Sequence, residues 1–341
     1  MKKKYTIHDI AKKLNITAST VSRALNDHPR ISEATKKAVQ RAAVKLNYQP
    51  NNIAAALRNG KSNIIGIIVP TVDRNFFASI VRGIEEIANA SRYNVMICQT
   101  YDNYEKEVAT VEALLNARVD GIIASHAKET KDFEHFLKVK EKGIPVILFD
   151  RFNDELEVSQ VVSDDFLGAY KATEHLIQQG CKRIAHFTNM LKISIYKERL
   201  RGYVEALQAH GFTYDESLVV ESNLQLEDGR ESMQKLLALP QLPDGIFSAS
   251  AYGVMGALQV LKEKGIKVPQ EIALIGFTNE PFCSFSEPAL STVDQHNMRM
   301  GNAAAEIFLE EIADEEKKFI PQKIVLKPEL IIRQSSLRKK S

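Results

Sequence analysis

Apolar residues within the first 48 positions recur every three or four residues, which is the spacing of one face of an α-helix. Asn15 follows the first of these faces, while Thr17 and Ser32 precede the second and third, as hydroxyl-bearing N-caps do. The three inward faces are formed by Ile7, Ile10, Ala11 and Leu14, by Val21, Ala24 and Leu25, and by Val39, Ala42, Ala43 and Leu46. Two short helices joined by a tight turn form a helix-turn-helix. The pattern therefore predicts a small all-α domain of this type over residues 1–48.

From Ile64 onward, short apolar strands alternate with amphipathic helices. The stretches IIGIIVP, YNVMICQ, DGIIAS and PVILFD are followed after Val161 by a second series, which contains RIAHFT, GIFSAS and IALIGF. Apolar runs joined by helices are typical of parallel sheets covered on both faces. The pattern predicts an α/β body of two doubly wound parallel-sheet lobes, with a ligand cleft at the carboxyl ends of their strands.

Residues 49–62 connect these two patterns. Ile53, Ala54 and Leu57 would share one face of a two-turn helix between Pro50 and Gly60. An isolated helix shorter than about 12 residues is marginal in water, so we expect this segment to be helical only when it packs against a partner. A plain interdomain linker is the alternative.

Composition narrows the class of protein. The chain has 341 residues, of which 44% are hydrophobic and 26% charged, and no apolar run is long enough to span a membrane. Its basic N-terminus lacks the apolar segment of a secretory signal, and its three scattered cysteines indicate neither a disulfide framework nor a metal cluster. We therefore expect a cytoplasmic protein with no membrane partner, no metal and no cofactor.

The charges are unevenly distributed along the chain. Residues 1–61 hold 13 Lys and Arg side chains against three acidic ones, whereas the remainder holds 32 against 40. A basic head on an acidic body indicates that the head meets a polyanion. A solvated lysine-rich face fits the same count.

The second helix of the head leaves small, polar and cationic side chains facing outward, namely Ala18, Ser19, Ser22, Arg23 and Asn26. Such a face suits the major groove of DNA, where Arg can donate two hydrogen bonds to guanine and hydroxyl groups can hold phosphates. A protein-docking domain is the alternative, but it would normally present a large apolar anchor. Ala18 is the only apolar residue on this face, so we favour a helix that reads DNA.

The segments TIHDIA, TVSRALN, LNYQPN and IAAAL resemble, in order and spacing, the head of the LacI/GalR family of bacterial transcription regulators. The resemblance implies that Ala18, Ser19 and Arg23 read bases. Leu57 falls where the family inserts a side chain between base steps of the minor groove. Further DNA contacts are implied for Thr6, His8, Thr17, Thr20, Ser22, Asn26, Arg30, Ser32, Tyr48, Asn51 and Ala54.

The resemblance also implies a homodimer that binds pseudo-palindromic, double-stranded operator DNA. It extends to periplasmic sugar-binding proteins, in which the chain crosses between two lobes three times. The expected domains are the head at 1–48, the hinge at 49–62, a first lobe of 63–161 plus 292–323, and a second lobe of 162–291 plus 324–337. The tail lacks the leucine heptads of a tetramer. Candidates for the subunit interface are the helix after Phe77 and the helix around Ala303–Ile312.

Residues at the predicted strand ends supply a candidate effector pocket. Arg199 occupies the position of the family's effector-binding arginine, and Phe76 and Phe77 would stack on a sugar or base. Each has a structural alternative: the phenylalanines in the core, Asp150 as a helix cap, and Arg199 in an ion pair with Glu198 or another acid. The full candidate set is Asp73, Asn75, Phe76, Phe77, Tyr101, Ser125, His126, Asp150, Arg199, Ser250, Thr278 and Asn279.

Two places depart from the resembled family. Thr278 and Asn279 stand where the family usually has an acid, and Ala251, preceded by Ser250, stands where it usually has an Asp. Ionised acceptors form the stronger hydrogen bonds to sugar hydroxyls, so the loss of two carboxylates favours a phosphorylated or acidic sugar as the small-molecule effector. Arg199, together with Arg74, Arg151 or His126, would then bind the negatively charged group of this effector.

The sequence contains no nucleotide-binding, hydrolase or metalloprotease motif, so we expect no catalytic residues and no enzyme. A sugar-binding transport or sensor protein without a DNA role would explain the body but not the basic head. We therefore expect a DNA-binding transcriptional regulator, a repressor by resemblance, that is controlled allosterically by a small metabolite.

Overall fold

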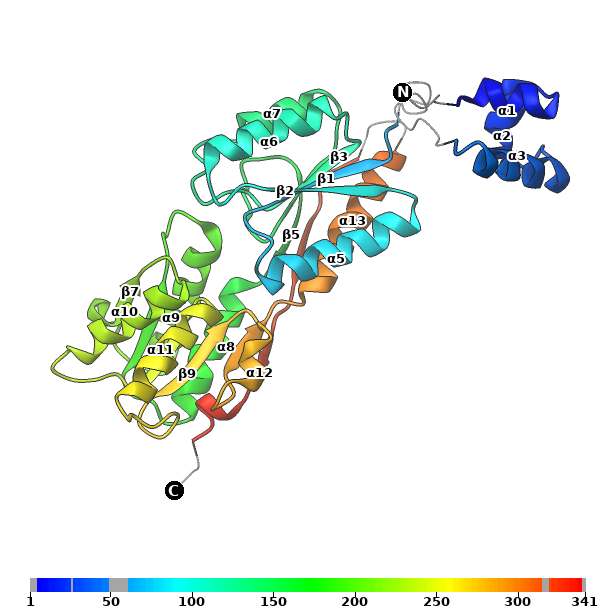
Figure 1. Ribbon diagram of the computed structural model, residues 1–341. Helices are drawn as coiled ribbons and strands as arrows, with labels where there is room; N and C mark the ends of the chain where they lie inside the picture. Colours follow the sequence, from blue (N-terminus) through cyan, green and yellow to red (C-terminus); the bar gives the residue numbers. More distant parts are fainter. Residues whose placement is uncertain (1–4, 26, 49–60, 315–318, 339–341) are drawn as a thin grey trace. The chain divides into compact units, whose positions relative to one another are not determined.

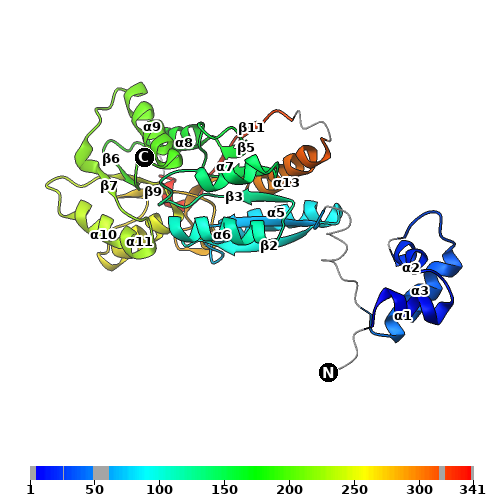
Figure 2. The ribbon, with the colours of Figure 1, turned by 90° about the horizontal axis from the view of Figure 1, so that it is seen from above.

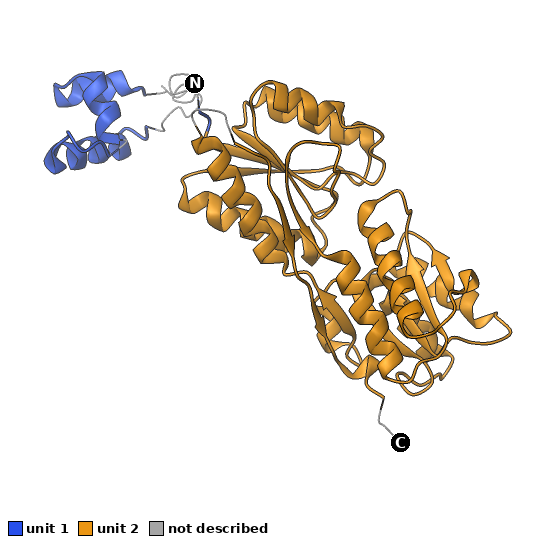
Figure 3. Ribbon diagram, turned by 180° about the vertical axis from the view of Figure 1, so that it is seen from behind, with its two compact units in different colours: residues 1–62 blue, residues 63–341 orange. Residues whose placement is uncertain are grey.

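The computed structural model describes residues 5–25, 27–48, 61–314 and 319–338. The chain forms two compact units, residues 1–62 and 63–341 (Figure 3). Each hydrophobic cluster of the described residues lies within one of these units. The predicted hinge helix lies outside the described residues, as do Asn26, Asn51, Ala54 and Leu57. Among the described helices, none is both long and apolar enough to cross a lipid bilayer.

Unit 1 contains the predicted three helices, α1 (Ile7–Leu14), α2 (Ala18–Leu25) and α3 (Glu33–Lys45) (Figure 1). Asn15 ends α1 in a left-handed conformation with φ 52°. The amide of Thr20 donates to Thr17 Oγ1 (3.1 Å) and that of Thr35 donates to Ser32 Oγ (3.3 Å), so both predicted N-caps are confirmed. The core of the unit is formed by Ile10, Ala11, Val21, Ala24, Val39 and Ala42.

The first lobe of unit 2 is built on a six-stranded, all-parallel sheet in the order β11-β5-β4-β3-β1-β2. α5 (Asn75–Ala90) and α13 (Asn297–Ala313) cover one face of this sheet, while α6 (Tyr104–Asn116) and α7 (Glu134–Glu141) cover the other (Figure 1). This double cover explains the continuous apolar runs of the inner strands. The strands are β1 (Ile64–Val69), β2 (Asn94–Gln99), β3 (Gly121–Ala124), β4 (Val146–Phe149), β5 (Ser159–Ser163) and β11 (Lys323–Leu326).

The second lobe repeats this topology in the order β12-β10-β9-β8-β6-β7, with β12 antiparallel to β10 and the other pairs parallel. α8 (Asp165–Gln178) and α9 (Ser194–Ala209) lie side by side on one face, and α10 (Leu226–Leu237) and α11 (Ala251–Glu263) on the other (Figure 2). The strands are β6 (Ile184–Thr188), β7 (Val219–Glu221), β8 (Gly245–Ser248), β9 (Ala273–Phe277), β10 (Ser291–Asp294) and β12 (Glu329–Ile331), with a short α12 (Phe282–Phe285) after β9. Two doubly wound lobes are thus confirmed.

The strand pairing corrects the predicted lobe boundaries. β5 continues to Ser163 in the first sheet, although the first crossing was predicted near 161. β10 pairs with β9 in the second lobe, although residues 292 onward were assigned to the first, and β11 pairs with β5 in the first lobe, although residues 324 onward were assigned to the second. Each crossing therefore lies a few residues later than predicted. Polar residues inside these strands, such as Ser163 and Thr292, obscure the strand ends in the hydropathy pattern.

Candidate DNA-binding surface and effector cleft

The start of α2 presents a group of hydroxyls at the surface of unit 1. Thr17 Oγ1 lies 2.8 Å from Ser19 Oγ and 2.9 Å from Thr20 Oγ1, and it also accepts the Thr20 amide. Arg23, one turn further along the helix, is exposed. The amides and dipole at a helix N-terminus favour anions. This end of α2 therefore offers hydroxyls, amides and a guanidinium to a phosphate or a base edge.

Most of the predicted DNA-contact residues that the structure describes lie at the surface of unit 1. Ala18 differs from the prediction, because positions 18, 21 and 25 share a helical face and Ala18 packs in part against the core. The outward side chains of α2 within the described residues are therefore polar. Of the other predicted contacts, Thr6, His8, Thr17, Ser19, Arg23, Arg30 and Ser32 are exposed, and Thr20, Ser22 and Tyr48 are half-buried.

One basic side chain of the head serves the fold. Lys36 on α3 is 8% exposed, and its Nζ lies 2.6 Å from Asp27 Oδ1 and 2.8 Å from Glu33 Oε1. The hydrogen bond to Asp27, followed by that to Glu33, raises the pKa of Lys36. The ammonium ties the turn after α2 to the first turn of α3, so the positive charge of the head is not all available to a polyanion.

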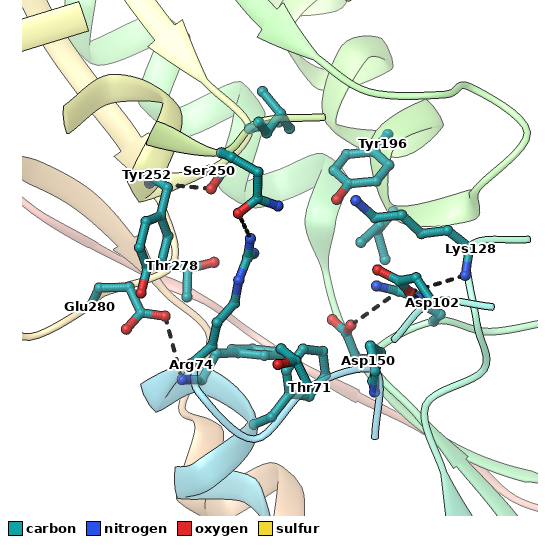
Figure 4. A pocket seen from close by; sticks show the side chains of 18 of the residues that line it. Thr71, Arg74, Asp102, Lys128, Asp150, Tyr196, Ser250, Tyr252, Thr278 and Glu280 are labelled. Atoms are coloured by element: carbon teal, nitrogen blue, oxygen red, sulfur yellow. Dashed lines mark hydrogen bonds and ion pairs between the residues drawn. The ribbon is translucent and has the colours of Figure 1, made fainter. Parts of the chain in front are cut away.

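The second candidate site is a cavity of about 260 Å³ between the two lobes, at the carboxyl ends of their strands (Figure 4). Open α/β sheets bind ligands in this crevice, and the volume suits a small metabolite. The cavity is lined by the segments that follow β1, β2, β3 and β4 in the first lobe and β6, β7, β8, β9 and β10 in the second.

Eight of the predicted effector residues line this cavity, namely Asp73, Phe76, Phe77, Tyr101, Asp150, Arg199, Ser250 and Thr278. Phe76 and Phe77 also belong to the core cluster of the first lobe, where their rings meet edge to face with centroids 4.9 Å apart. The two interpretations of these phenylalanines, core and pocket, are therefore compatible. Asp150 caps no helix, because the first helix after it in the chain, α8, begins only at Asp165.

The other four predicted residues, Asn75, Ser125, His126 and Asn279, do not line the cavity. Asn279 is held by hydrogen bonds to Asp294 Oδ2 and from Arg333 Nη2, each 2.9 Å long. Burial, followed by the neighbouring Arg151 guanidinium, lowers the pKa of His126 to about 4. A histidine with this pKa is neutral near pH 7, and His126 does not line the cavity, so both observations argue against the prediction that it supplies positive charge to a ligand.

Arg199 reaches the cavity from α9 but already has an acidic partner. Its Nε donates to Asp165 Oδ1 (2.8 Å), its Nη2 lies 2.7 Å from the same oxygen, and its Nη1 donates to the Ala249 carbonyl (2.8 Å). The guanidinium carbon lies 3.8 Å from the centre of the Phe277 ring. The two predicted alternatives for Arg199 are therefore compatible, because it pairs with an acid and also lines the pocket. Glu198 pairs with Arg201 instead.

A second buried cation lies at the first-lobe side of the cavity. Arg151 Nη1 donates to Asp102 Oδ1 and to the His126 carbonyl (2.7 Å). Burial opposes ionisation of Asp102, but the Arg151 guanidinium outweighs burial and holds the pKa of that carboxyl below its usual value. Asp150 keeps only a 4.0 Å approach to Arg151 Nε, and burial raises its pKa. Its carboxyl group faces the cavity, where it can meet a ligand hydroxyl (Figure 4).

The sequence prediction missed several lining residues, namely Asp102, Lys128, Tyr196, Gln225, Tyr252, Glu280 and Gln295. Arg74 and Lys128 come from different loops of the first lobe, and each faces a tyrosine of the second (Figure 4). The Arg74 guanidinium carbon lies 4.9 Å from the Tyr252 ring centre, and Lys128 Nζ lies 5.7 Å from that of Tyr196. Within the described part of the chain, neither cation forms an ion pair with a carboxylate. The sequence could have indicated Lys128 by its position, since this residue closely follows the end of β3.

Glu280 corrects the prediction that this loop has lost its acid. It lies one residue after Asn279, lines the cavity and is 3% exposed. Its Oε1 accepts the amide of Phe76 from the first lobe (3.4 Å), and burial raises its pKa. A carboxylate is therefore present at the cleft, but the first lobe already engages it.

A helix-turn-helix unit followed by a two-lobed α/β body with a metabolite-sized cleft defines a class of ligand-responsive DNA-binding regulators. The chain belongs to the LacI family of this class. Residues 6–51 match the model for bacterial regulatory proteins of the lacI family, and residues 62–327 match that for periplasmic binding proteins and the sugar-binding domain of the LacI family. The family consists of transcription regulators, so the chain is not an enzyme.

Similar proteins cover nearly the whole chain. The HTH-type transcriptional repressor PurR of Actinobacillus pleuropneumoniae serotype 3 (strain JL03) is 32% identical over 330 residues, which are 97% of this chain and 98% of the relative. The structure of a transcriptional regulator CelR–cellobiose complex is 27% identical with a TM-score of 0.74, covering 97% of this chain and 100% of that one. The lac repressor dimer bound to operator and the anti-inducer ONPF shares the fold, with 22% identity, a TM-score of 0.87 and coverage of 98% and 100%.

Proposed function

We propose that this protein is a transcriptional repressor that binds a pseudo-palindromic operator as a homodimer. One α2 would enter the major groove in each half-site, with Ser19 and Arg23 reading bases and the exposed hydroxyls of Thr17 and Ser32 holding phosphates. The observation that carries the proposal is the polar, exposed face of α2 on a unit whose positive charge contrasts with the acidic remainder. The PurR relatives, which are repressors, support the sign of control.

A gel-shift assay with a palindromic fragment from the protein's own promoter region tests this proposal. Lys and Arg contacts release counterions, so affinity should fall steeply as the salt concentration rises. Replacing Arg23 with Ala should weaken binding to the operator about 10- to 100-fold and affect random DNA much less, because a bidentate base contact contributes about 1–3 kcal/mol of discrimination. A matched control is Gln40→Ala on the exposed side of α3. A transport or sensor protein without a DNA role would bind neither fragment.

The hinge remains part of the proposal. Leu57 would insert between base steps of the minor groove, and the two hinge segments of the dimer would stabilise each other. Replacing Leu57 with Ala should weaken operator binding and leave metabolite binding nearly unchanged. Unaltered operator affinity would count against this role.

The inter-lobe cleft would bind the effector, for which we propose a small polyhydroxylated metabolite with an acidic or phosphate group. Arg74 and Lys128 support the charge of that group, because both are cations at the cavity without a carboxylate partner among the described residues. Asp150 would accept its hydroxyls. The only acid in the 278–280 segment, Glu280, is engaged by the first lobe, and Asp102 pairs with Arg151. Of the four carboxylates that line the cavity, Asp73 and Asp150 are therefore left for a neutral sugar.

Calorimetric titration with neutral sugars, sugar acids, sugar phosphates and nucleobases would distinguish the effector classes. Binding of neutral sugars alone would overturn the acidic class, and binding of nucleobases alone would favour stacking on the aromatic residues of the cavity. Effector and operator affinity should be linked through one coupling free energy, typically about 1–3 kcal/mol. The same titration in the presence of operator would then show whether the effector recruits or releases DNA.

A further inference from the structure

The first turn of α5 has no cap from its own segment. The first amides of a helix have no partner within the helix, and a polar side chain at the N-cap normally accepts one of them. Arg74 occupies the N-cap of α5 with extended backbone angles (φ −103°, ψ 132°), and its side chain makes no capping hydrogen bond. The start of α5 therefore depends on an acceptor from elsewhere.

That acceptor comes from the other lobe. Glu280 follows β9 of the second lobe and lies 204 positions after Phe76 in the sequence. Its Oε1 accepts the amide of Phe76 at 3.4 Å, and the Asn75 amide is a further donor. The carboxyl group is almost fully buried, which raises its pKa, and the hydrogen bond from the Phe76 amide and the positive end of the α5 dipole oppose that rise. Charged acceptors form the stronger hydrogen bonds.

A second contact ties the same turn to the second lobe. The Nη2 of Arg74 donates to Gln225 Oε1 at 2.6 Å, and the guanidinium lies over the ring of Tyr252 (Figure 4). Gln225 is itself the N-cap of α10, in a capping box with Asp228, so it is a fixed partner. Both contacts lie on one side of the cavity.

We propose that Glu280 is a positioning residue that caps α5 across the cleft, so that the order of the first turn of α5 depends on closure of the lobes. Separation of the lobes removes the cap, exposes a buried carboxylate to water and leaves the amides of Asn75 and Phe76 without an acceptor. α5 follows β1, whose first residue, Ile64, is the start of the body after the hinge segment. If the proposed function holds, cleft closure would be coupled through β1 to the segment that leads to the DNA-binding unit. Only this last step depends on the proposed function.

The proposal is tested by hydrogen–deuterium exchange of the full-length protein without DNA or metabolite. Glu280→Ala should raise the exchange rate of the amides in the first turn of α5 about five- to tenfold, which is the loss expected for a helix cap. Glu280→Gln keeps one acceptor oxygen and should produce a smaller rise. The control is Glu287→Gln, which removes the same charge from an exposed side chain of the same lobe and should change nothing in α5.

The pattern of exchange separates a cap from a general structural role. If Glu280 acts as the cap, β8 and β9 in the core of the second lobe keep their protection while the first turn of α5 loses it. Unchanged exchange in both Glu280 variants would overturn the proposal, as would an equal effect of Glu287→Gln or a loss of protection spread over β8 and β9. If Glu280→Ala fails to fold, Glu280→Gln decides. Failure of operator binding would leave this measurement unaffected, so the two proposals fail separately.

Discussion

The guanidinium of Arg199 is fixed before any metabolite enters the cleft. Asp165 and the Ala249 carbonyl hold three of its nitrogens, and the Phe277 ring supports its plane. Holding the group in advance reduces the entropy that a ligand must overcome to bind it. The same arrangement makes the fold dependent on the pair, since removal of one partner leaves a buried charge without compensation.

Asp165→Asn tests this dependence. Burial raises the pKa of Asp165 to about 7, so the pair is fully ionised only above neutral pH, and the measurement belongs at about pH 8. We expect urea denaturation to show a loss of about 3 kcal/mol in the free energy of unfolding. The exposed pair of Arg201 and Glu205 provides the control, and Glu205→Gln should cost less than about 1 kcal/mol. Equal effects of the two variants would contradict the structural importance of the buried pair.

His186 gives a pH-dependent prediction. Its ring is stacked between Tyr203 and Phe247, its Nδ1 lies 3.0 Å from the Phe247 carbonyl, and burial lowers its pKa to about 4 from 6.5. Between these values the unfolded chain binds a proton at this residue and the folded chain does not. The stabilising contribution is therefore present above about pH 6.5 and is lost as the pH falls towards 4, by up to about 3 kcal/mol.

His186→Phe should flatten this part of the stability profile. The variant loses one hydrogen bond, so its unfolding free energy should be lower than that of the wild type near pH 7. It should change less than that of the wild type between pH 7 and pH 4, so the difference between the two proteins should shrink or reverse as the pH falls. His126 and Asp165 also titrate in this range, and both remain in the two proteins, so their contributions cancel in the difference. Parallel profiles from urea titrations at several pH values would show that His186 is not the titrating group.

The sequence could identify individual site residues only where a local pattern marked them. Arg199 was found through a family position, and Phe76, Asp150 and Thr278 through their places after strands. Glu280 was missed because its partner, the amide of Phe76, is 204 positions away. Asn279 resembled a pocket residue, but its side chain turns to Asp294 and Arg333, and no periodicity reveals that choice.

At the scale of elements, α5 and α13 are two predicted helices whose close packing against each other the sequence did not reveal. We expected both helices at a subunit interface. Contacts within a single chain do not test this prediction. Within the lobe they pack against each other through glycines: a Cβ on Gly301 would lie 2.1 Å from the Ile80 carbonyl oxygen, and one on Gly83 would lie 2.4 Å from that of Met298. The two backbones are therefore in direct contact.

Gly301→Ala tests this packing. Because the new methyl group would meet backbone rather than a flexible side chain, the two helices must move apart, and we expect the unfolding free energy to fall by about 2 kcal/mol or more. The control on the same helix is Glu306→Ala, whose side chain is exposed and whose effect should stay within about 0.5 kcal/mol. Thermal unfolding followed by circular dichroism measures both. A Gly301→Ala variant as stable as the control would show that the helices can separate without cost.

Element prediction succeeded where hydrophobic periodicity was strong. The three helices of the head and the strands β1, β3, β4, β8 and β9 appear where apolar spacing indicated them. β7 was missed because it has only three residues, and α10 because its sequence LEDGRESMQKLL is mostly polar, with only a few buried positions. β10 and β11 were assigned to the wrong lobes, because strand pairing across a crossover leaves no local signal.

At the scale of the whole molecule, charge and packing divide the chain at the same place. Among the described residues, unit 1 has a single small core and unit 2 has four hydrophobic clusters of its own. The basic excess lies in residues 1–61. If DNA binding belongs to the first unit and metabolite binding to the second, the two functions should be separable by cutting the chain between them.

A protein that begins at Asn63 should therefore keep its fold and no longer bind DNA. Its thermal unfolding midpoint should stay within a few degrees of that of the body in the full chain, because the clusters of unit 2 include none of the described residues of unit 1. The full chain has a pI of about 8.2, whereas the truncated chain carries more acidic than basic side chains, so it should bind an anion-exchange column at pH 8 that the full chain passes. Gel shifts with the operator fragment should disappear. A truncated protein that still shifts the operator would place DNA recognition in the body and contradict the role of α2. The full-length Arg23→Ala protein is the control. If it is folded but binds the operator weakly, the loss of binding comes from the head rather than from unfolding.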